Sequence, residues 1–240
     1  ERTPLFECNG MLFDKEPSIL EILKKNPFAD FFSFENFVFN SINQHICNYN
    51  WKTFIEVYLD DYHVDPFHPG LNNLVDCKNL SWHFENEFSI QAVGISDLKK
   101  PTTPIYRKWN DSILQSSGNN IPKFGAIWML IYPNVMLEWY PKTIVISTLH
   151  PLSPQKTLNI TEFYYSEDVG LFDLEFINNQ QKAYYETVLE DDEIAIKIDR
   201  GRKIMSHNSQ EEYGPYHDQL EAGIPYFYKY LSQNCNGLYN

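Results

Sequence analysis

The sequence contains few cysteines, and none of them forms a spaced pair. The four are Cys8, Cys47, Cys77 and Cys235, with no C-x-x-C arrangement among them. Such wide spacing is unlike a disulfide-rich scaffold, so we expect free thiols in a reducing, cytoplasmic compartment. Long apolar runs are also lacking. The run IWMLIYPNVML has eleven residues and contains a proline, which makes it too short to span a bilayer.

Basic residues are in the minority. The chain has 19 Lys and Arg against 32 Asp and Glu, a formal net charge of −13. Phosphates of nucleic acid and anionic membrane surfaces would repel it, so we expect neither as a partner. The first residues, ERTPLFEC, show no signal-peptide pattern and no initiator methionine, so we expect this to be part of a longer product.

The composition is that of a globular protein. Of the 240 residues, 43% are apolar and 21% charged, which suits a packed core rather than disorder. The length fits one large domain or two small ones. We take residues 1–240 as a single domain. Aromatic residues reach 16%, enough to line an apolar cavity or simply to fill the core.

The hydrophobic pattern predicts helices on both sides of a strand-rich region. Helices are expected over residues 17–25, 50–62, 178–201 and 216–233. Asn50 is a candidate N-cap for the second of these helices, and Pro66 is expected to stop it. Gly201 is a candidate C-cap for the third.

Residues 81–165 have the alternation typical of strands. The segment WHFENEFSIQAVGI predicts one strand with Phe84, Phe88, Ile90 and Ala92 on one face. Turns are expected at residues 133–134, 141–142 and 151–155, and the segment 110–122 is expected to be a loop. This order predicts an α+β domain in which helices cover one side of an antiparallel sheet.

Two histidines five residues apart stand in the stretch EVYLDDYHVDPFHPG. Asp60 and His63 are three apart and share a helix face. Pro66 intervenes before His68, so a turn is expected to bring the second imidazole round to the first. Two imidazoles suit Fe, Zn, Cu or Ni. The spacing alone is a weak pattern, however, and an ordinary polar turn remains an alternative.

A third ligand would have to come from elsewhere, and the segment LEDDEIAIKIDRG offers carboxylates. The candidates are Glu190, Asp191, Asp192 and Glu193. Asp191 lies three before Ile194 and can share the apolar stripe of a helix, whereas Asp192 groups with Ala195 and Ile196. A carboxylate on an apolar stripe requires a compensating partner, for which a metal is one candidate. A solvated acidic face is the alternative.

Several segments together resemble one family. The pattern N-W-K-x-x-x-E-x-Y-x-D-x-Y-H-x-x-x-x-H-P-G, residues 50–70, is similar to the mononuclear-iron motif of Rieske non-haem iron oxygenases. These comprise the ring-hydroxylating oxygenase α subunits and their choline- and carnitine-monooxygenase-like relatives. The segments GAIWMLIYPNVMLEWYP, E-D-x-x-x-x-x-x-x-x-x-G and GPYHDQLEAGIPYFYKYL resemble the core strand pair, the third-ligand segment and the closing helix of this family. The resemblance spans nearly the whole chain.

The resemblance implies roles for individual residues. It makes His63 and His68 ligands of Fe(II), with Asp191 as the carboxylate ligand and Asp192 as its one-residue alternative. Asp60 matches a carboxylate that links an iron-ligating histidine to a Rieske-ligating histidine of the neighbouring subunit. Asn50 matches a polar residue near the iron, although the helix cap is an equal alternative.

The resemblance also implies a setting for the site. The fold would be of the helix-grip, START-like type, an antiparallel sheet wrapped around a long C-terminal helix. The chain would form a homotrimer, and its substrates would be a small organic molecule and O2. Trp128, Met136 and Trp139 are candidates for the cavity wall or for ordinary core. His83, His150, His207 and His217 fit no ligand pattern, so we expect them to be polar surface or satisfied buried groups.

The Rieske cluster motif itself is missing from this sequence. Such a cluster needs Cys-x-His and Cys-x-x-His, and His45-Ile46-Cys47 has the reverse order. We therefore expect the [2Fe-2S] cluster on a missing domain or a partner, with a Rieske domain or a ferredoxin/reductase supplying electrons. A degenerate relative that has lost the Rieske domain is the remaining alternative. The segment NGMLF resembles the usual junction strand. Without such a partner we expect iron binding but no turnover.

Two other functions fit the same residues. A His2Asp site can hold zinc and activate water for hydrolysis. A non-catalytic ligand-binding module on the same fold, with a vestigial metal site, is the second alternative. Metal content and oxygen-dependent activity distinguish the three.

Overall fold

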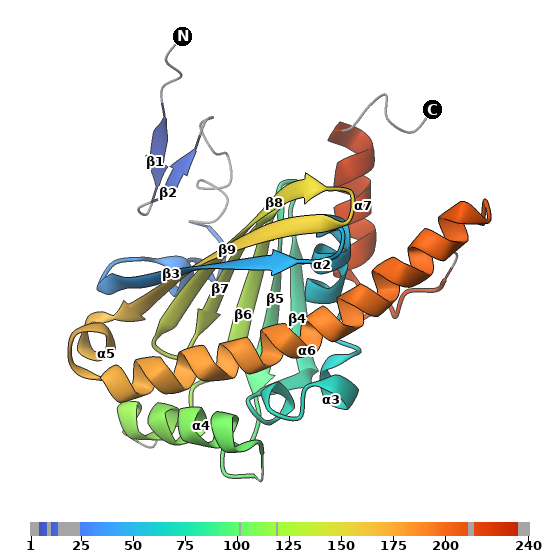
Figure 1. The fold of residues 1–240 in the computed structure, drawn as a ribbon. Helices are drawn as coiled ribbons and strands as arrows, with labels where there is room; N and C mark the ends of the chain where they lie inside the picture. Colours follow the sequence, from blue (N-terminus) through green and yellow to red (C-terminus); the bar gives the residue numbers. More distant parts are fainter. Residues whose placement is uncertain are drawn as a thin grey trace.

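A computed structural model describes residues 5–8, 11–13, 25–100, 102–118, 120–210 and 214–234. Its centre is a seven-stranded sheet (Figure 1) with the order β3-β9-β8-β7-β6-β5-β4. The strands are β3 (Phe37–Cys47), β4 (Val75–Phe84), β5 (Phe88–Ile95), β6 (Phe124–Ile131), β7 (Val135–Tyr140), β8 (Thr143–Ser153) and β9 (Lys156–Ser166). Every neighbouring pair is antiparallel. The predicted α+β class with an antiparallel sheet is confirmed.

Helices are distributed around this sheet. They are α2 (Trp51–Tyr58), α3 (Val64–Phe67), α4 (Pro104–Ser116), α5 (Glu167–Phe172), α6 (Leu174–His207) and α7 (Gly223–Asn234), with short 3-10 turns at Ala29–Phe32 and Leu71–Asn73. Two short strands, β1 (Phe6–Cys8) and β2 (Met11–Phe13), pair with each other. Within the described residues, no helix is long and apolar enough to cross a membrane.

The long helix α6 crosses one face of the sheet, and α4 lies alongside it (Figure 1). Tyr106, Trp109 and Ile113 of α4 are buried against this face, together with Phe176 of α6. The opposite face is covered by Phe32 and its phenylalanine-rich neighbours. Both faces of the central strands are therefore buried, and this explains their nearly continuous apolar runs.

Three predicted helices have different limits in the structure. The helix predicted for residues 178–201 extends over Leu174–His207. The second helix ends at Tyr58, and Pro66 lies inside the separate short helix α3 rather than terminating the first. A proline is tolerated there because the first-turn N–H groups of a helix have no intrahelical acceptor. The final helix begins at Gly223, not at residue 216. The helix predicted for residues 17–25 lies almost entirely outside the described residues.

Two predictions of local structure were wrong. The single strand predicted for residues 82–95 is a hairpin, because β4 and β5 pair antiparallel on either side of residues 85–87. The loop predicted for residues 110–122 belongs in its first half to α4, which Thr103 caps by accepting a hydrogen bond from the Tyr106 N–H. The turns predicted at residues 133–134 and 141–142 are present, as is a turn at 154–155.

Alanine substitutions at two glycines are expected to change stability in opposite directions. An alanine Cβ at Gly125 would lie 2.7 Å from the Leu74 carbonyl oxygen and 3.0 Å from that of Gly94, both of which are backbone. Gly125→Ala is therefore expected to lower the free energy of unfolding by about 1–3 kcal/mol. Gly201 is not a C-cap, because α6 continues to His207, and no atom lies within 4 Å of an added Cβ.

The matched variant Gly201→Ala should therefore raise the free energy of unfolding by about 0.5–1 kcal/mol, since alanine favours a helix interior. Urea unfolding of both variants beside the wild-type chain measures the two effects. Equal stability of the two variants would contradict this account of the packing at Gly125.

Candidate metal centre and its cavity

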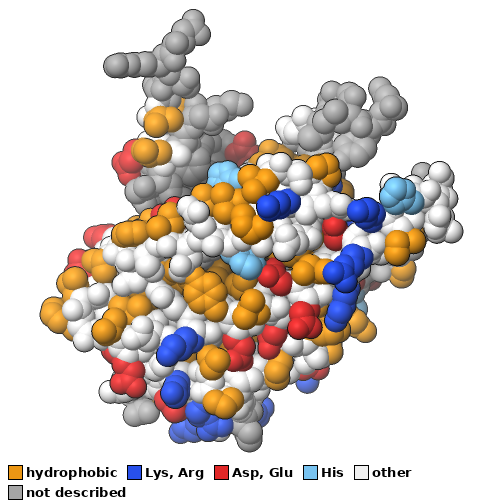
Figure 2. All heavy atoms as spheres, viewed as in Figure 1, with side chains coloured by type: hydrophobic (Ala, Val, Ile, Leu, Met, Phe, Trp, Pro, Cys, Tyr) orange, Lys and Arg blue, Asp and Glu red, His pale blue; other side chains and the backbone are white. Residues whose placement is uncertain are grey.

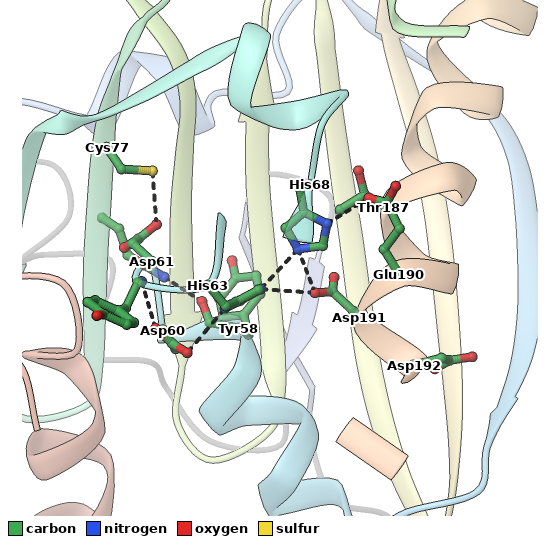
Figure 3. Close-up of polar contacts among 12 residues, drawn as sticks. Tyr58, Asp60, Asp61, His63, His68, Cys77, Thr187, Glu190, Asp191 and Asp192 are labelled. Atoms are coloured by element: carbon green, nitrogen blue, oxygen red, sulfur yellow. Dashed lines mark hydrogen bonds and ion pairs between the residues drawn. The ribbon is translucent and has the colours of Figure 1, made fainter. Parts of the chain in front are cut away.

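His63 and His68 flank one turn of helix. His63 is the N-cap of α3 and His68 is its C-cap, and the His68 N–H donates to the Val64 carbonyl. Both imidazoles are buried, with exposed side-chain fractions of 9% and 1%. The turn points both rings toward the same side of α6, so their Nε2 atoms lie 2.9 Å apart (Figure 3).

Asp191 of α6 completes a group of three donors. Its Oδ1 lies 3.2 Å from His63 Nε2 and 3.0 Å from His68 Nε2. For metal–ligand bonds of about 2.1 Å, neighbouring donors in an octahedral set are about 3 Å apart. Two imidazoles and one carboxylate at these separations fit a divalent transition metal with open positions, as in a two-histidine-one-carboxylate site.

A carboxylate also lies behind each imidazole. Asp60 Oδ2 lies 3.2 Å from His63 Nδ1, and Glu190 Oε2 lies 2.7 Å from His68 Nδ1. Carboxylates in these positions fix the ring orientation and make the other nitrogen a stronger ligand. The spacing predicted a helix face shared by Asp60 and His63, but α2 ends at Tyr58, so the two side chains meet in the turn between α2 and α3. The position of Glu190 behind His68 was not predicted, because Glu190 was considered only as a candidate third ligand.

The charges around the two imidazoles favour a positive centre. Burial by itself lowers the pKa of His63, but the hydrogen bond with Asp191 and the close Asp60 carboxylate outweigh it and raise that pKa to about 10. Burial raises the pKa of Asp191, yet its hydrogen bonds with His63 and His68 bring it down to about 2. Acidic side chains gather where the middle of α6 passes α3 (Figure 2). A divalent cation would replace the protons held there.

Asp192 points away from the two imidazoles (Figure 3). Its Oδ2 lies 2.7 Å from His45 Nε2 and its Oδ1 accepts a hydrogen bond from the Tyr49 hydroxyl at 2.7 Å. Successive residues of a helix are about 100° apart, so two adjacent carboxylates face different partners. Asp192, His45 and Cys47 form a second group of candidate metal ligands. Cys47 and Cys77 are free thiols, as predicted.

Asn50 does not line the cavity beside the imidazoles. Its side chain accepts a hydrogen bond from the Lys52 N–H at 2.9 Å and donates one to the Pro154 carbonyl at 2.6 Å. The helix-cap interpretation is thus confirmed for this residue. His150, His207 and His217 are exposed, and His83 is half-buried beside Glu85.

The cavity beside the candidate metal ligands is aromatic and acidic. None of its lining residues is a lysine or arginine. Trp128, a candidate for either the cavity wall or the core, lines it together with Tyr58, Trp109 and Tyr184. Met136 and Trp139 do not. Met136 packs with α2 and α7, and Trp139 contacts Phe31 on the opposite face of the sheet.

Glu138 is a buried carboxylate in this cavity. It lies on β7 with an exposed fraction of 4%, and it accepts hydrogen bonds from the hydroxyls of Tyr140 at 2.8 Å and Tyr184 at 3.3 Å. Burial raises its pKa from 4.5 to about 7, and the two hydroxyl donors only partly oppose that rise. The ionised form is therefore destabilising in the folded state.

Replacement of Glu138 by glutamine is expected to stabilise the protein at pH 8. Because the folded-state pKa is above the ordinary value, the wild-type chain loses stability as pH rises from about 4.5 through about 7. Glutamine lacks this penalty, so the variant should exceed the wild type by roughly 1–3 kcal/mol at pH 8 and match it near pH 4.5.

Urea unfolding at pH 5 and pH 8 tests this expectation. Glu162→Gln is a matched control, because Glu162 accepts from the Tyr164 hydroxyl at 2.8 Å in a similar pair that is half-exposed. The control should change by less than about 0.5 kcal/mol. A Glu138→Gln variant that is less stable than the wild type at pH 8 would show that the carboxylate stabilises the fold.

Comparisons with known proteins agree with this architecture. The family model described as ring hydroxylating alpha subunit (catalytic domain) matches residues 30–237. Putrescine 2-hydroxylase from Ralstonia nicotianae is 45% identical, over 95% of this chain and 63% of that protein. The putrescine 2-hydroxylase of Bordetella bronchiseptica is 43% identical, over 96% of this chain and 54% of that protein. Choline monooxygenase of Amaranthus tricolor is 26% identical, over 78% of this chain and 38% of that protein.

Among solved structures, the quaternary ammonium Rieske monooxygenase CntA with L-carnitine superposes with a TM-score of 0.65 at 17% identity. That match covers 96% of this chain and 60% of the CntA chain. The chain thus spans between about half and two thirds of the two putrescine hydroxylases it resembles. On this basis the chain belongs to the ring-hydroxylating oxygenase α-subunit family, and the part present here is the catalytic domain.

Proposed function

We propose that this chain is the catalytic part of an iron-dependent oxygenase. It would bind one Fe(II) through His63, His68 and Asp191 and use O2 to hydroxylate or demethylate a small organic substrate. The observation that carries the proposal is the convergence of two imidazole nitrogens and one carboxylate oxygen within 3.2 Å of one another at the wall of a buried cavity. The names of the relatives, hydroxylase and monooxygenase, support the same chemistry.

The residues around the ligands have distinct tasks in this proposal. Asp60 and Glu190 hold the two imidazoles with their Nε2 atoms toward the cavity. The aromatic wall keeps water from the reacting carbon, which limits unproductive oxidation. When bound, the iron would supply O2 activation at the positions that the three protein ligands leave open.

Electrons would come from a Rieske [2Fe-2S] centre outside these residues. In the proposed assembly, a homotrimer in the cytoplasm, Asp60 links His63 to the cluster of a neighbouring subunit. The Asp60 side chain keeps a solvent-exposed fraction of 24%, which leaves it accessible to such a partner. The wrapping of the sheet and the long helix α6 also support the helix-grip fold expected from the sequence.

The substrate is proposed to be a small aliphatic amine. Two relatives at 43–45% identity are named for putrescine, and a more distant one is named for choline. The lining of the cavity is acidic and has no lysine or arginine, which disfavours an anionic substrate. Butane-1,4-diamine is therefore the first compound to test.

The experiment is purification with and without air, metal analysis, and turnover with a reduced Rieske donor under 18O2. The expected result is about one iron per chain and one 18O atom in the hydroxylated amine. Stoichiometric zinc that supports hydrolysis, with no oxygen-dependent product after Fe(II) loading, would establish the hydrolase alternative instead. A chain that takes up no metal would favour the ligand-binding module.

A further inference from the structure

We propose that Glu138 binds the ammonium group of a protonated primary amine in the cavity beside the metal ligands. The inference deepens the proposed function and rests on it, because it states how the same cavity would hold its substrate. It names a counter-ion residue and selects primary amines over quaternary ammonium compounds.

The first observation is an acidic group without a cationic side chain beside it. Glu138 lies on a central strand, where burying a carboxylate is unfavourable unless a partner compensates. Its hydrogen-bonding partners are two neutral tyrosines, Tyr140 and Tyr184, and no lysine or arginine lines the cavity. A carboxylate has about four acceptor positions, so at least one remains for a further donor.

The second observation is a set of polar atoms that have no partner. The Tyr58 hydroxyl and Asp61 Oδ2 are buried without a hydrogen-bond partner, and both residues line this cavity. Burial raises the pKa of the Tyr58 hydroxyl, and Glu138, Tyr184 and Asp61 raise it further. An ammonium group carries three N–H donors, which these acceptors would satisfy.

The third observation is the aromatic wall. Trp109 contacts Tyr140 with ring centroids 5.7 Å apart, and the Trp128 indole N–H donates to the Tyr140 hydroxyl at 3.0 Å. Aromatic faces attract any organic cation, so by themselves they would also accept choline or carnitine. A quaternary ammonium has no N–H and would leave the buried acceptors unpaired, which carries a desolvation penalty.

The test is calorimetric titration of Fe(II)-loaded protein without air at pH 8, which requires neither electrons nor turnover. The probes are butane-1,4-diamine, choline and the uncharged butane-1,4-diol. We expect the diamine to bind at least about tenfold more tightly than either other probe. Comparable binding of choline or of the diol to the wild-type protein would overturn the proposal without any variant.

The variants sharpen the test. Glu138→Gln should weaken diamine binding by about 30-fold or more, while iron content stays equal and stability at pH 8 is not reduced. The matched Glu162→Gln variant should bind like the wild type. Unchanged diamine affinity in Glu138→Gln would overturn the role of this carboxylate, including the case in which the amine is held by the iron alone.

Tyr58→Phe provides a second variant that removes an unpartnered hydroxyl at nearly constant volume. It should weaken diamine binding and leave diol binding unchanged, whereas equal diamine affinity would count against the proposed acceptor set. The outcomes separate the two proposals. Glu138-dependent binding without oxygen-dependent product would refute the oxygenase function alone, and hydroxylation with Glu138-independent binding would refute the ammonium site alone.

Discussion

Replacing His68 with alanine is expected to weaken iron binding by more than about 100-fold. Loss of a residue that only hydrogen-bonds to a ligand already weakens metal binding by about 10–100-fold, and loss of the ligand itself should exceed this. The imidazole is 1% exposed and its Nε2 lies 2.9 Å from His63 Nε2. Oxygen-dependent hydroxylation should disappear with the metal. Metal analysis after dialysis against Fe(II) without air measures the first effect, and product formation with a reduced Rieske donor measures the second.

His150→Ala is the matched control for this prediction. His150 lies on β8, is exposed, and belongs to neither candidate ligand group. The control variant should retain the iron content and the activity of the wild type. A His68→Ala protein that keeps stoichiometric iron would show that the ion binds elsewhere, with the second ligand group around His45 as the next site to examine.

The second large effect separates two adjacent carboxylates. Asp191→Asn is expected to lose iron, because Asp191 Oδ1 is the oxygen that lies within 3.2 Å of both imidazoles. Asp192→Asn should keep iron but lose stability by about 1–3 kcal/mol, because it weakens the bonds to His45 and Tyr49. The two variants make the same Asp-to-Asn change at adjacent positions, so any difference between them reflects the position alone.

Iron content and urea unfolding, measured on both variants, test this contrast. The opposite pattern, with iron lost in Asp192→Asn and kept in Asp191→Asn, would move the third ligand by one residue. Loss of iron in both variants together with lowered stability would point to a general disturbance of α6. Equal stability of Asp192→Asn and the wild type would contradict the structural role of the contact with His45.

The sequence predicted the parts of the site that local spacing determines. Asp60 and His63 are three residues apart, and their side chains meet as expected, although in the turn between α2 and α3 and not on the predicted helix. The third ligand was narrowed to four carboxylates on one helix. The choice among them depends on how α6 is rotated against the sheet, and an alternation of apolar residues on a largely polar helix specifies that rotation only weakly.

Long-range partners were the part that sequence reasoning missed. Glu190 faces His68 and Asp192 faces His45 across separations of 122 and 147 residues, which no local pattern reveals. The helix α4 was missed for another reason. Its buried side chains Tyr106 and Trp109 precede the polar stretch that was interpreted as a loop, so the helical spacing was divided between two segments.

Pro66 had the opposite role to the one expected. It does not end the preceding helix, because α2 stops at Tyr58. It lies inside the short helix α3 (Val64–Phe67), which has a candidate metal ligand at each end. The return of the chain at His68 is therefore produced by a second short helix and not by a break in the first.

This placement of α3 links metal occupancy to local order. His63 and His68 bracket four helical residues, an element far too short to persist without tertiary contacts. An ion bound to both ends would oppose opening of the turn. Part of its binding free energy would therefore stabilise the ordered conformation of residues 60–74. Loss of iron is thus expected to increase the rate of amide hydrogen exchange first in residues 60–74, while the strands of the sheet stay protected.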